Sequence, residues 1–270
     1  MKKLREKYHY SWILLKELVK TDFKLRYEGS ILGIIWSALK PLLLFGVMYV
    51  VFVHFLRFGE GVPFFAAALL LAIVLWNFFQ EATSQGMTSI VNNGDILRKI
   101  NIPKYVVVVS ATVSALINLG INLVIVIFFA LISGVQFSWS ALIVIPIIVE
   151  LYIFSLAVAL LLSTLYVKFR DLAHIWDVVI QAAYFATPII YPLSMIMVMN
   201  ETAAKALLLN PMAQIIQDAR HVMIYNQTET IWNTLGNPFL MMVPIVIVIV
   251  MVIVGVLFFH KSSKYFTELV

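Results

Sequence analysis

Long apolar runs dominate this sequence and limit what it can fold into. Six segments carry about 20 or more mostly apolar residues, the length that a helix needs to cross a bilayer. We expect them to be transmembrane helices, at about 35–56, 64–86, 106–133, 141–166, 172–191 and 238–259. Hydrophobic residues make up 62% of the 270 and charged residues 12%, whereas soluble domains have roughly 45–50% and 25%. The chain is therefore expected to be an all-α polytopic membrane protein, a single transmembrane domain over residues 1–270.

Two regions depart from simple spanning helices. The expected span at 172–191 is diluted by Asp177, Gln181 and Pro188. Residues 192–237 are too polar to span and too long to be a turn. We expect short helices there, outside the membrane and between the fifth and sixth spans, with helix starts at prolines such as Pro192.

The basic residues follow a topological pattern. Fifteen of the 19 Lys and Arg residues fall on one side of the predicted spans, three fall on the other, and Lys40 lies inside the first span. Because basic loops remain in the cytoplasm, this predicts that both termini are cytoplasmic. The net charge of +5 is explained by this topology, so a nucleic-acid partner is not expected.

Residues 11–26 form a different kind of segment. Apolar residues recur at helical spacing on one face and lysines on another: Trp12, Leu15, Val19 and Phe23 against Lys16, Lys20 and Lys24. This pattern is typical of an amphipathic helix that lies in the cytoplasmic membrane interface. A soluble helix packed on a partner is the alternative.

Enzyme motifs are absent from the sequence. It has no cysteine, which excludes thiol chemistry and disulfides. It also lacks a G-x-x-x-x-G-K-[ST] phosphate loop, a G-x-S-x-G elbow and an H-E-x-x-H metal motif. The five histidines are scattered. We therefore expect no catalytic residue, no metal site, and no ATP bound by this chain itself.

What remains is a series of polar breaks at the membrane boundaries. They are residues 26–33 with Trp36 and Pro41, residues 93–99 with Pro103, residues 168–172, residues 187–192, and residues 209–211 with Arg220. In this order, on a six-span chain, they resemble the permease subunits of type-2 ATP-binding-cassette exporters, in the polysaccharide branch. That branch exports lipid-linked O-antigen, capsule or teichoic acid. The resemblance runs from about residue 20 to residue 260.

The resemblance implies contacts with a separate P-loop ATPase. Residues 92–104 match a cytoplasmic coupling helix, with Asp95, Leu97, Arg98 and Lys99 as contact residues. A second contact is expected at Arg170 and Asp171. Physically, the 92–104 segment also fits an ordinary basic anchoring loop. Asp171 also fits the role of a cap for the fifth span.

Aromatic faces are the candidate substrate pathway. Sugars have apolar C–H faces that suit aromatic side chains. Phe45, Tyr49 and Phe52 recur at i, i+4 and i+7, which places them on one face of the first helix. Tyr184 and Tyr191 share a face of the fifth. Helix packing or an interfacial aromatic belt would explain the same residues.

Charged residues near or within the spans are the remaining candidates. Arg26, Lys40 and Arg98 lie near the cytoplasmic boundary, where they could contact the diphosphate head group of a lipid-linked glycan. Membrane anchoring is the alternative reading for them. Ionisable groups inside spans are costly and so indicate function; these are Glu81, Glu150 and Asp177. Structural pairing, with Lys40 or Arg26 as partners, is the alternative.

The resemblance also implies the assembly. Two copies of this chain pair in a bacterial inner membrane, and two ATPase subunits carrying ATP and magnesium dock on them. Nucleotide-driven closure then moves a lipid-linked glycan outward. A type-2 exporter of a drug or lipid has the same architecture and remains the alternative. An ion-coupled carrier is a further one.

Overall fold

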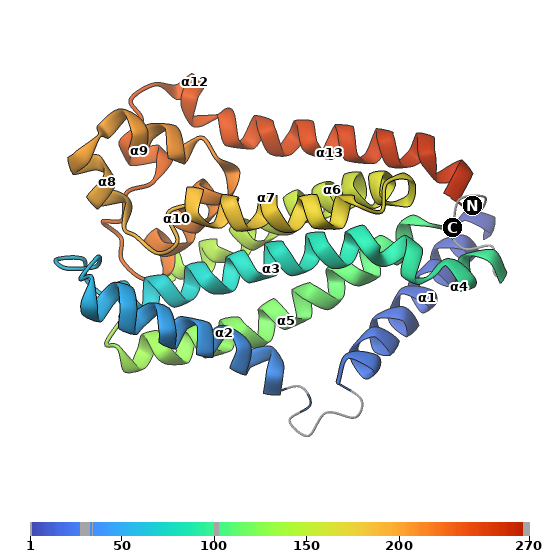
Figure 1. The fold of residues 1–270 in the computed structure, drawn as a ribbon, viewed down its shortest axis with the longest axis horizontal. Coiled ribbons are helices and arrows are strands. Elements are labelled where there is room, and N and C mark those ends of the chain that lie inside the picture. The colour runs from blue at the N-terminus through green and yellow to red at the C-terminus, as the bar shows by residue number, and fades with distance from the viewer. Residues whose placement is uncertain (1, 28–32, 34, 100–102, 267–270) are drawn as a thin grey trace.

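The structure is a computed structural model that describes residues 2–27, 33, 35–99 and 103–266. Within this part of the chain every regular element is helical. The longer helices are α1 (Lys2–Tyr27), α2 (Ile35–Met48), α3 (Phe65–Asn92), α5 (Tyr105–Ile132), α6 (Val144–Lys168), α7 (Leu172–Ala186) and α13 (Val243–Ser262). The shorter helices are α4 (Gly94–Lys99), α8 (Leu193–Met199), α9 (Glu201–Leu208), α10 (Pro211–Met223), α11 (Ile231–Thr234) and α12 (Pro238–Met241). Most of the long helices follow the long axis of the molecule (Figure 1).

Five helical segments are long and apolar enough to cross a membrane. They are Ile35–Phe55, Phe65–Asn92, Tyr105–Ile132, Trp139–Lys168 and Pro238–Ser262. The first combines α2 with a π-helical continuation at Tyr49–Phe55, and the fourth begins with a 3₁₀ turn at Trp139–Ile143. These segments confirm five of the expected spans and the all-helical class, and they make the chain a multi-pass membrane protein.

The remaining expected span is shorter than the sequence suggested. Helix α7 has 15 residues and ends at Ala186 instead of reaching residue 191. A helix of that length is about 22 Å long, less than the roughly 30 Å hydrocarbon core. Pro188 explains the break, since a proline disfavours helical geometry in the residue before it. Thr187 is accordingly extended, with φ −105° and ψ 138°.

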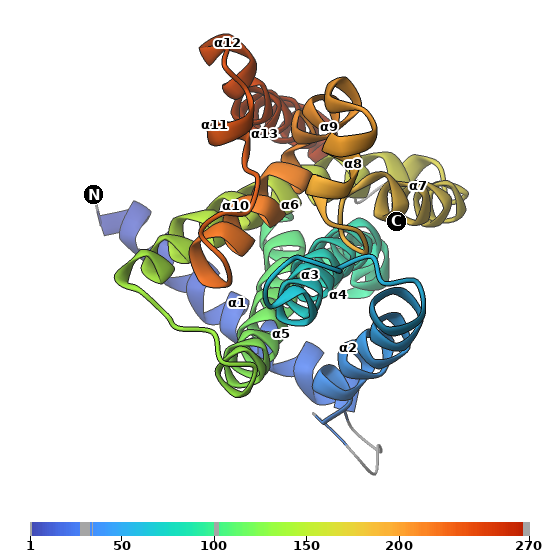
Figure 2. The same cartoon turned by 90° about the vertical axis from the view of Figure 1, so that its left-hand side faces the viewer.

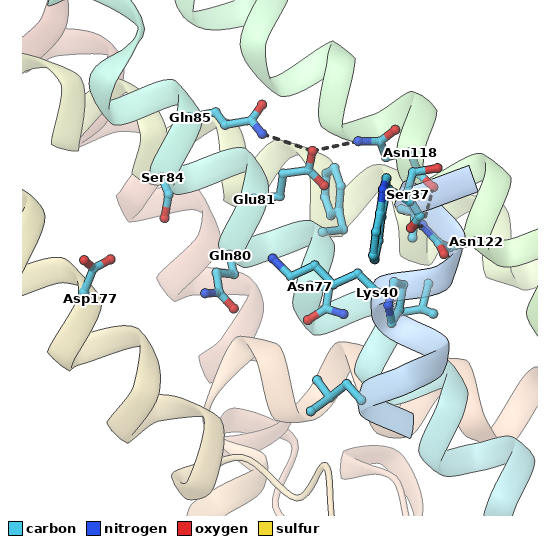
Figure 3. A pocket seen from close by; sticks show the side chains of 16 residues that line it. Ser37, Lys40, Asn77, Gln80, Glu81, Ser84, Gln85, Asn118, Asn122 and Asp177 are labelled. Carbon is cyan, nitrogen blue, oxygen red and sulfur yellow. Dashed lines mark hydrogen bonds between the residues drawn. The ribbon is translucent and has the colours of Figure 1, made fainter. Parts of the chain in front are cut away.

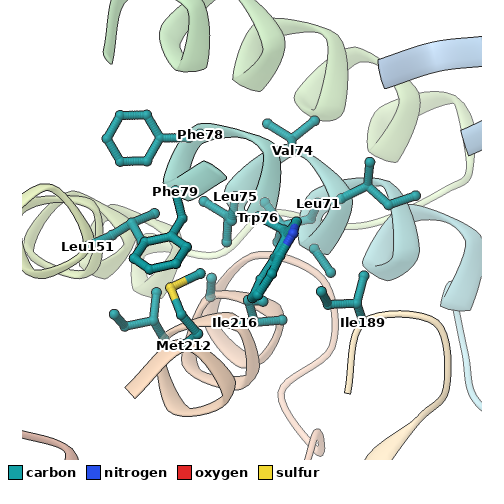
Figure 4. Packing of buried hydrophobic residues seen from close by; sticks show 14 of the residues in the cluster. Leu71, Val74, Leu75, Trp76, Phe78, Phe79, Leu151, Ile189, Met212 and Ile216 are labelled. Atoms are coloured by element: carbon teal, nitrogen blue, oxygen red, sulfur yellow. The ribbon is translucent and has the colours of Figure 1, made fainter. Parts of the chain in front are cut away.

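Helix α3 is the centre of the bundle. Figure 2 shows it enclosed by α2, α5, α6 and α10, and 78% of its most apolar stretch is buried. Trp76 and Phe79 of α3 lie among side chains of α6 and α10, including Leu151, Met212 and Ile216 (Figure 4). The mostly apolar sequence of α3 thus reflects burial by protein, whereas only 17% of the apolar stretch of α13 is buried within the chain.

Two glycines allow neighbouring helices to approach closely. A Cβ atom on Gly86 of α3 would lie 2.6 Å from the Ala159 Cβ of α6, and one on Gly255 of α13 would lie 2.5 Å from the Ala157 backbone oxygen. Small residues at such crossings are the usual basis of helix packing in membranes. Helix α6 is therefore held tightly on two sides.

The segment after α7 is held by a buried arginine on α10. The Arg220 guanidinium, 2% exposed, donates hydrogen bonds to the carbonyls of Pro188 (2.8 Å), Ile189 (2.7 Å) and Ala68 (3.1 Å). It also donates to Gln217 Oε1 at 3.1 Å. The non-helical carbonyls left by the break in α7 thereby gain a donor, which buried backbone groups require. Arg220 joins α10, the end of α7 and the start of α3.

Helix α1 is longer than the expected 11–26 segment. Leu18 is buried in a cluster of apolar side chains that includes Val107 of α5 and Leu160 of α6. Trp12 is 55% exposed, with Lys16 Nζ 5.3 Å from its ring. The helix thus uses the Leu18 side to contact the bundle and leaves Trp12 outward. Its place in the membrane interface stays a prediction.

Candidate functional site: a polar cavity between α2, α3, α5 and α7

One face of α3 carries polar side chains within an otherwise apolar span. Glu81, Ser84 and Gln85 lie four, seven and eight residues after Asn77, so the four side chains share a face of the helix. Gln80 lies beside them. Polar groups inside membrane segments are costly and are retained where they face a cavity or a partner. This stripe is the most unusual feature of the spans.

The stripe faces a cavity of about 700 Å³. Helix α2 contributes Ser37 and Lys40, α5 contributes Asn118 and Asn122, and α7 contributes Asp177 (Figure 3). Apolar parts of the wall come from residues such as Trp36 and Leu44. Ligand sites commonly have this composition, an apolar wall with a few polar groups.

Hydrogen bonds hold the polar wall in place. Glu81 Oε1 accepts hydrogen bonds from Asn118 Nδ2 at 2.7 Å and from Gln85 Nε2 at 3.1 Å. Asn122 Nδ2 donates to the backbone oxygen of Ser37 at 3.1 Å, which ties α5 to α2. Two amide donors from different helices thus meet at one oxygen, which makes Glu81 an organising group of the α3–α5 face.

The cavity lies beside the least buried helices of the bundle. Only 11% of the most apolar stretch of the α2 span is buried, and Ile180 is the single buried residue within α7. Lys40 and Asp177, which line the cavity from these two helices, are both exposed. A surface with apolar helices on both sides and charged groups between them suits a second protein subunit.

The three aromatic residues of the first span are arranged differently from the single helix face that the sequence predicts. Phe45 is buried, with its ring 5.2 Å from that of Phe129 on α5, and Tyr49 is 40% exposed. Phe52 packs on Phe58 at 5.5 Å. The π-helical turn from Tyr49 to Phe55 changes the number of residues per turn, so the expected i, i+4, i+7 face does not continue to Phe52.

The two tyrosines expected to share a face at the end of α7 are separated by the helix break. Tyr184 is half-buried with its ring 5.7 Å from Trp76 of α3. Tyr191 lies beyond the break and donates from its hydroxyl to the Phe185 backbone oxygen at 3.0 Å. None of the five expected pathway aromatics lines the polar cavity. Their role in transport stays a prediction.

The predicted coupling residues lie on a short helix at one end of the bundle. Helix α4 presents Asp95, Arg98 and Lys99 outward and buries Leu97. Figure 1 places α4 at the same end as α1 and the C-terminal end of α13. Arg98, also proposed as a head-group contact, lies outside the polar cavity, whereas Lys40 lines it. The side chain of Arg26 lies outside the described residues.

The second predicted ATPase contact, at Arg170 and Asp171, directly precedes α7. Arg170 lies over the Tyr166 ring at 5.5 Å and is exposed, as is Asp171. The expectation that Asp171 caps the helix is wrong, since its side chain accepts no capping hydrogen bond. Asp171 has helical backbone angles, φ −68° and ψ −12°, whereas a capping residue is usually extended so that its side chain can reach the free N–H groups.

The remaining acidic residue of the spans, Glu150, is not among the residues that line this cavity. It lies on α6 beside Gln214 and Asp218 of α10. Gln214 Nε2 donates to Asp218 Oδ2 at 2.6 Å, and Trp232 Nε1 donates to the same oxygen at 3.1 Å. Burial raises the pKa of Asp218, while the bonds from Gln214 and Trp232 and the nearby His221 partly lower it.

Sequence reasoning missed most of the cavity wall. It singled out Lys40, Glu81 and Asp177 but not Asn118 or Asn122, although buried amides within an apolar span were a readable signal. It also gave Arg220 no role beyond marking a boundary. Among the described residues, no three His, Asp or Glu side chains gather as a metal site would require.

Comparison with known proteins places this arrangement in a family. Residues 13–224 match the ABC-2 type transporter family. An O-antigen export system permease protein RfbA of Myxococcus xanthus is 32% identical over 215 residues, 79% of this chain and 80% of that protein. One of the same name from Klebsiella pneumoniae is 27% identical over 269 residues, 98% of this chain and 99% of that protein. This chain, with its multi-pass helical fold, therefore belongs to the ABC-2 type transporter family as a membrane permease.

Proposed function

We propose that this chain is the transmembrane subunit of an ATP-driven exporter that moves a lipid-linked polysaccharide of the O-antigen type across a bacterial inner membrane. The similarity to O-antigen export permeases over nearly the full length of both chains is the observation that carries the proposal. The polar cavity supports it, because it offers a hydrophilic surface within the helices that span the membrane.

The chemistry of the cavity suits a glycan. Its wall combines amide and hydroxyl groups, from residues such as Asn77, Gln80 and Ser84, with the Trp36 indole. Amides donate and accept hydrogen bonds and thus match sugar hydroxyls, while an indole can lie against an apolar sugar face. A drug or lipid exporter, the alternative, would favour a more apolar wall.

The proposed transport unit contains two copies of this chain. The polar cavity is bordered by the exposed helices α2 and α7, and a second copy placed against them would enclose it. The path would then lie between subunits. Lys40 and the proposed Arg26 would meet the anionic head group of the lipid-linked glycan where it enters.

A permease of this family works with an ATPase subunit. We propose that two ATPase copies dock on α4 and on the turn at Arg170 and Asp171, and that ATP and magnesium bind to them. Leu97 anchors α4 in the bundle while Arg98 and Lys99 remain outward. Such a helix can transmit a movement of the partner into the adjoining helices α3 and α5.

We further propose that the α4 end of the bundle is cytoplasmic, together with both termini. Arg98, Lys99 and Lys168 lie at this end, as do Lys261 and Lys264 near the chain's C-terminus. Basic residues concentrate on the cytoplasmic side of membrane proteins. The short helices α8 to α12 then lie at the outer face.

The test is co-purification followed by an export assay. A tagged chain extracted from its own membranes in mild detergent should bring a soluble P-loop ATPase with it. The double variant Arg98→Glu, Lys99→Glu should release the ATPase, while Lys264→Glu, an exposed residue at the same end, should retain it. Cells with the double variant should lose surface polysaccharide. An unchanged surface polysaccharide in cells that lack the chain would refute the proposed cargo.

A further inference from the structure

A second cavity lies at the end of the bundle opposite α4. Its volume is about 240 Å³, below the roughly 300–1,000 Å³ of sites for drug-sized ligands. Its wall comes from the segment Gly61–Ala68, the start of α8, residues Gln217 and Arg220 of α10, and the loop that follows α10. We call it the Gln217 cavity. Its size suits one small ring.

Hydrogen-bonding capacity at this cavity is left unused. Gln217 is 1% exposed, and its Nε2 atom has no acceptor among the described residues. Its Oε1 atom is held by Arg220 Nη1, which fixes the orientation of the amide. Buried polar groups without partners are uncommon in proteins and call for an explanation. A ligand with an acceptor oxygen would satisfy Nε2.

Charges of both signs border the same cavity. Burial lowers the pKa of Arg220 to about 10, and the nearby Glu229 partly offsets the shift. Arg220 therefore remains charged at neutral pH, close to a carboxylate. An anionic ligand would meet Glu229 and a cationic one would meet Arg220. A neutral ligand with hydroxyl groups fits best, because a hydroxyl can accept from Gln217 and donate to Glu229.

A neighbouring hollow extends the surface. A cavity of about 430 Å³ shares Tyr225 with the Gln217 cavity and has further polar residues, Gln136, Ser138, Ser140, His221 and Asn226. The Tyr225 hydroxyl donates to Gln227 Oε1 at 2.8 Å, so the residue common to both walls is held by another residue of the Gln217 cavity. Two polar hollows that share an aromatic residue match a ligand made of linked rings better than a single small molecule.

We propose that the Gln217 cavity binds an uncharged sugar residue of a glycan at the outer end of the permease. Gln217 Nε2 donates to one sugar hydroxyl, Glu229 accepts from another, and Tyr225 separates this sugar from the next along the chain. The proposal rests on the proposed export of a glycan, and it assigns a sugar site outside the polar cavity of the transmembrane helices.

The test measures sugar binding by the full-length purified chain in detergent, without any ATPase. The probes are the methyl glycosides of glucose, galactose and mannose and the free sugar N-acetylglucosamine. Their binding is measured by saturation-transfer NMR. We expect saturable binding of at least one probe. Gln217→Glu keeps the acceptor for Arg220 but removes the donor, and should weaken that binding roughly tenfold, as the loss of one buried hydrogen bond predicts.

Glu229→Gln should also weaken binding, while Glu201→Gln should leave it unchanged. Glu201 lies on α9 at the same end of the molecule and pairs with Lys205 at 2.6 Å, outside both hollows, so it controls for a general effect of charge removal. Equal binding by wild type and Gln217→Glu overturns the proposal, as does the absence of binding by all four probes. Because no ATPase or transport is involved, either failure leaves the export proposal to its own test.

Discussion

Arg220 shows how one side chain can hold three parts of a membrane protein together. The N–H groups of its guanidinium donate hydrogen bonds to the successive backbone carbonyls of Pro188 and Ile189 and to the Ala68 carbonyl on α3. A lysine has the same charge but only a single donor group that cannot copy this planar geometry. The residue's role is therefore geometric as well as electrostatic.

We predict that Arg220→Lys destabilises the chain by about 3 kcal/mol, the lower end of the range for disrupting a buried charged network. Thermal unfolding in detergent should show a clearly reduced melting temperature, and the 187–192 segment should become sensitive to protease. Lys205→Arg, at an exposed ion pair on α9, is the control for a basic exchange and should be neutral. A wild-type melting temperature for Arg220→Lys would contradict the assigned role.

Asp218 is predicted to make stability depend on pH. Burial raises the folded-state pKa of this carboxyl, so the folded chain binds the proton more tightly than the unfolded chain does. Ionisation therefore weakens the fold at pH above the folded pKa, and this cost disappears as the pH falls through it. Asp218→Asn removes the cost and supplies a donor beside the unpartnered oxygens of Glu150 and Gln214.

At pH 7 we expect Asp218→Asn to raise the free energy of unfolding by about 1 kcal/mol, which should appear as a higher melting temperature. The difference between variant and wild type should become smaller toward pH 4. That difference, rather than either melting temperature alone, is the quantity to follow. A variant that is less stable at pH 7 would contradict the account.

At the scale of the helices, close packing depends on the two glycines that face α6. We predict that Gly255→Val destabilises the α6–α13 pair by roughly 1–3 kcal/mol, the usual cost of overpacking, because the Ala157 carbonyl occupies the space. The measurement is the melting temperature in detergent. Gly120→Val on α5, where an added Cβ meets nothing within 4 Å, should change it far less. Equal effects at both glycines would contradict the contact.

The helices were the most predictable part of the fold because the length and polarity of a span are local properties. Apolar runs located five spans, whereas the expected span at 172–191 ran past Pro188 and missed the end of α7 at Ala186. The partners of polar groups were not predictable. Asn118 reaches Glu81 across 37 residues of sequence, and Arg220 reaches Ala68 across 152. Such contacts depend on how the helices pack, which a periodic pattern in a single sequence does not specify.

The candidate site was only partly predictable for the same reason. Charged residues within spans stood out, and three of them, Lys40, Glu81 and Asp177, line the same cavity. The aromatic face did not continue, because the π-helical turn after Met48 alters the helix register, and no sequence motif marked that turn. The sequence thus indicated which residue types matter and left open which of them meet.

On the scale of the whole molecule, the bundle has a polar interior face between two little-buried helices. Helices α3, α5 and α6 form the packed body, α4 lies at one end, and α8 to α12 lie at the other (Figure 1). This arrangement would let an ATPase act at one end while a glycan leaves at the other. The proposed route between them passes the polar cavity.

The most direct test of this account is to capture the cargo in the cavity. A photo-reactive amino acid is placed at Gln80, an exposed residue of the cavity wall, in cells making the polysaccharide, and at Val124, an exposed residue of α5 outside the cavity, as control. Irradiation should attach a glycolipid to the Gln80 position and not to the Val124 position, detected by a sugar-specific stain and by mass. Phospholipid adducts alone, or equal glycolipid adducts at both positions, would contradict a glycan pathway through this cavity.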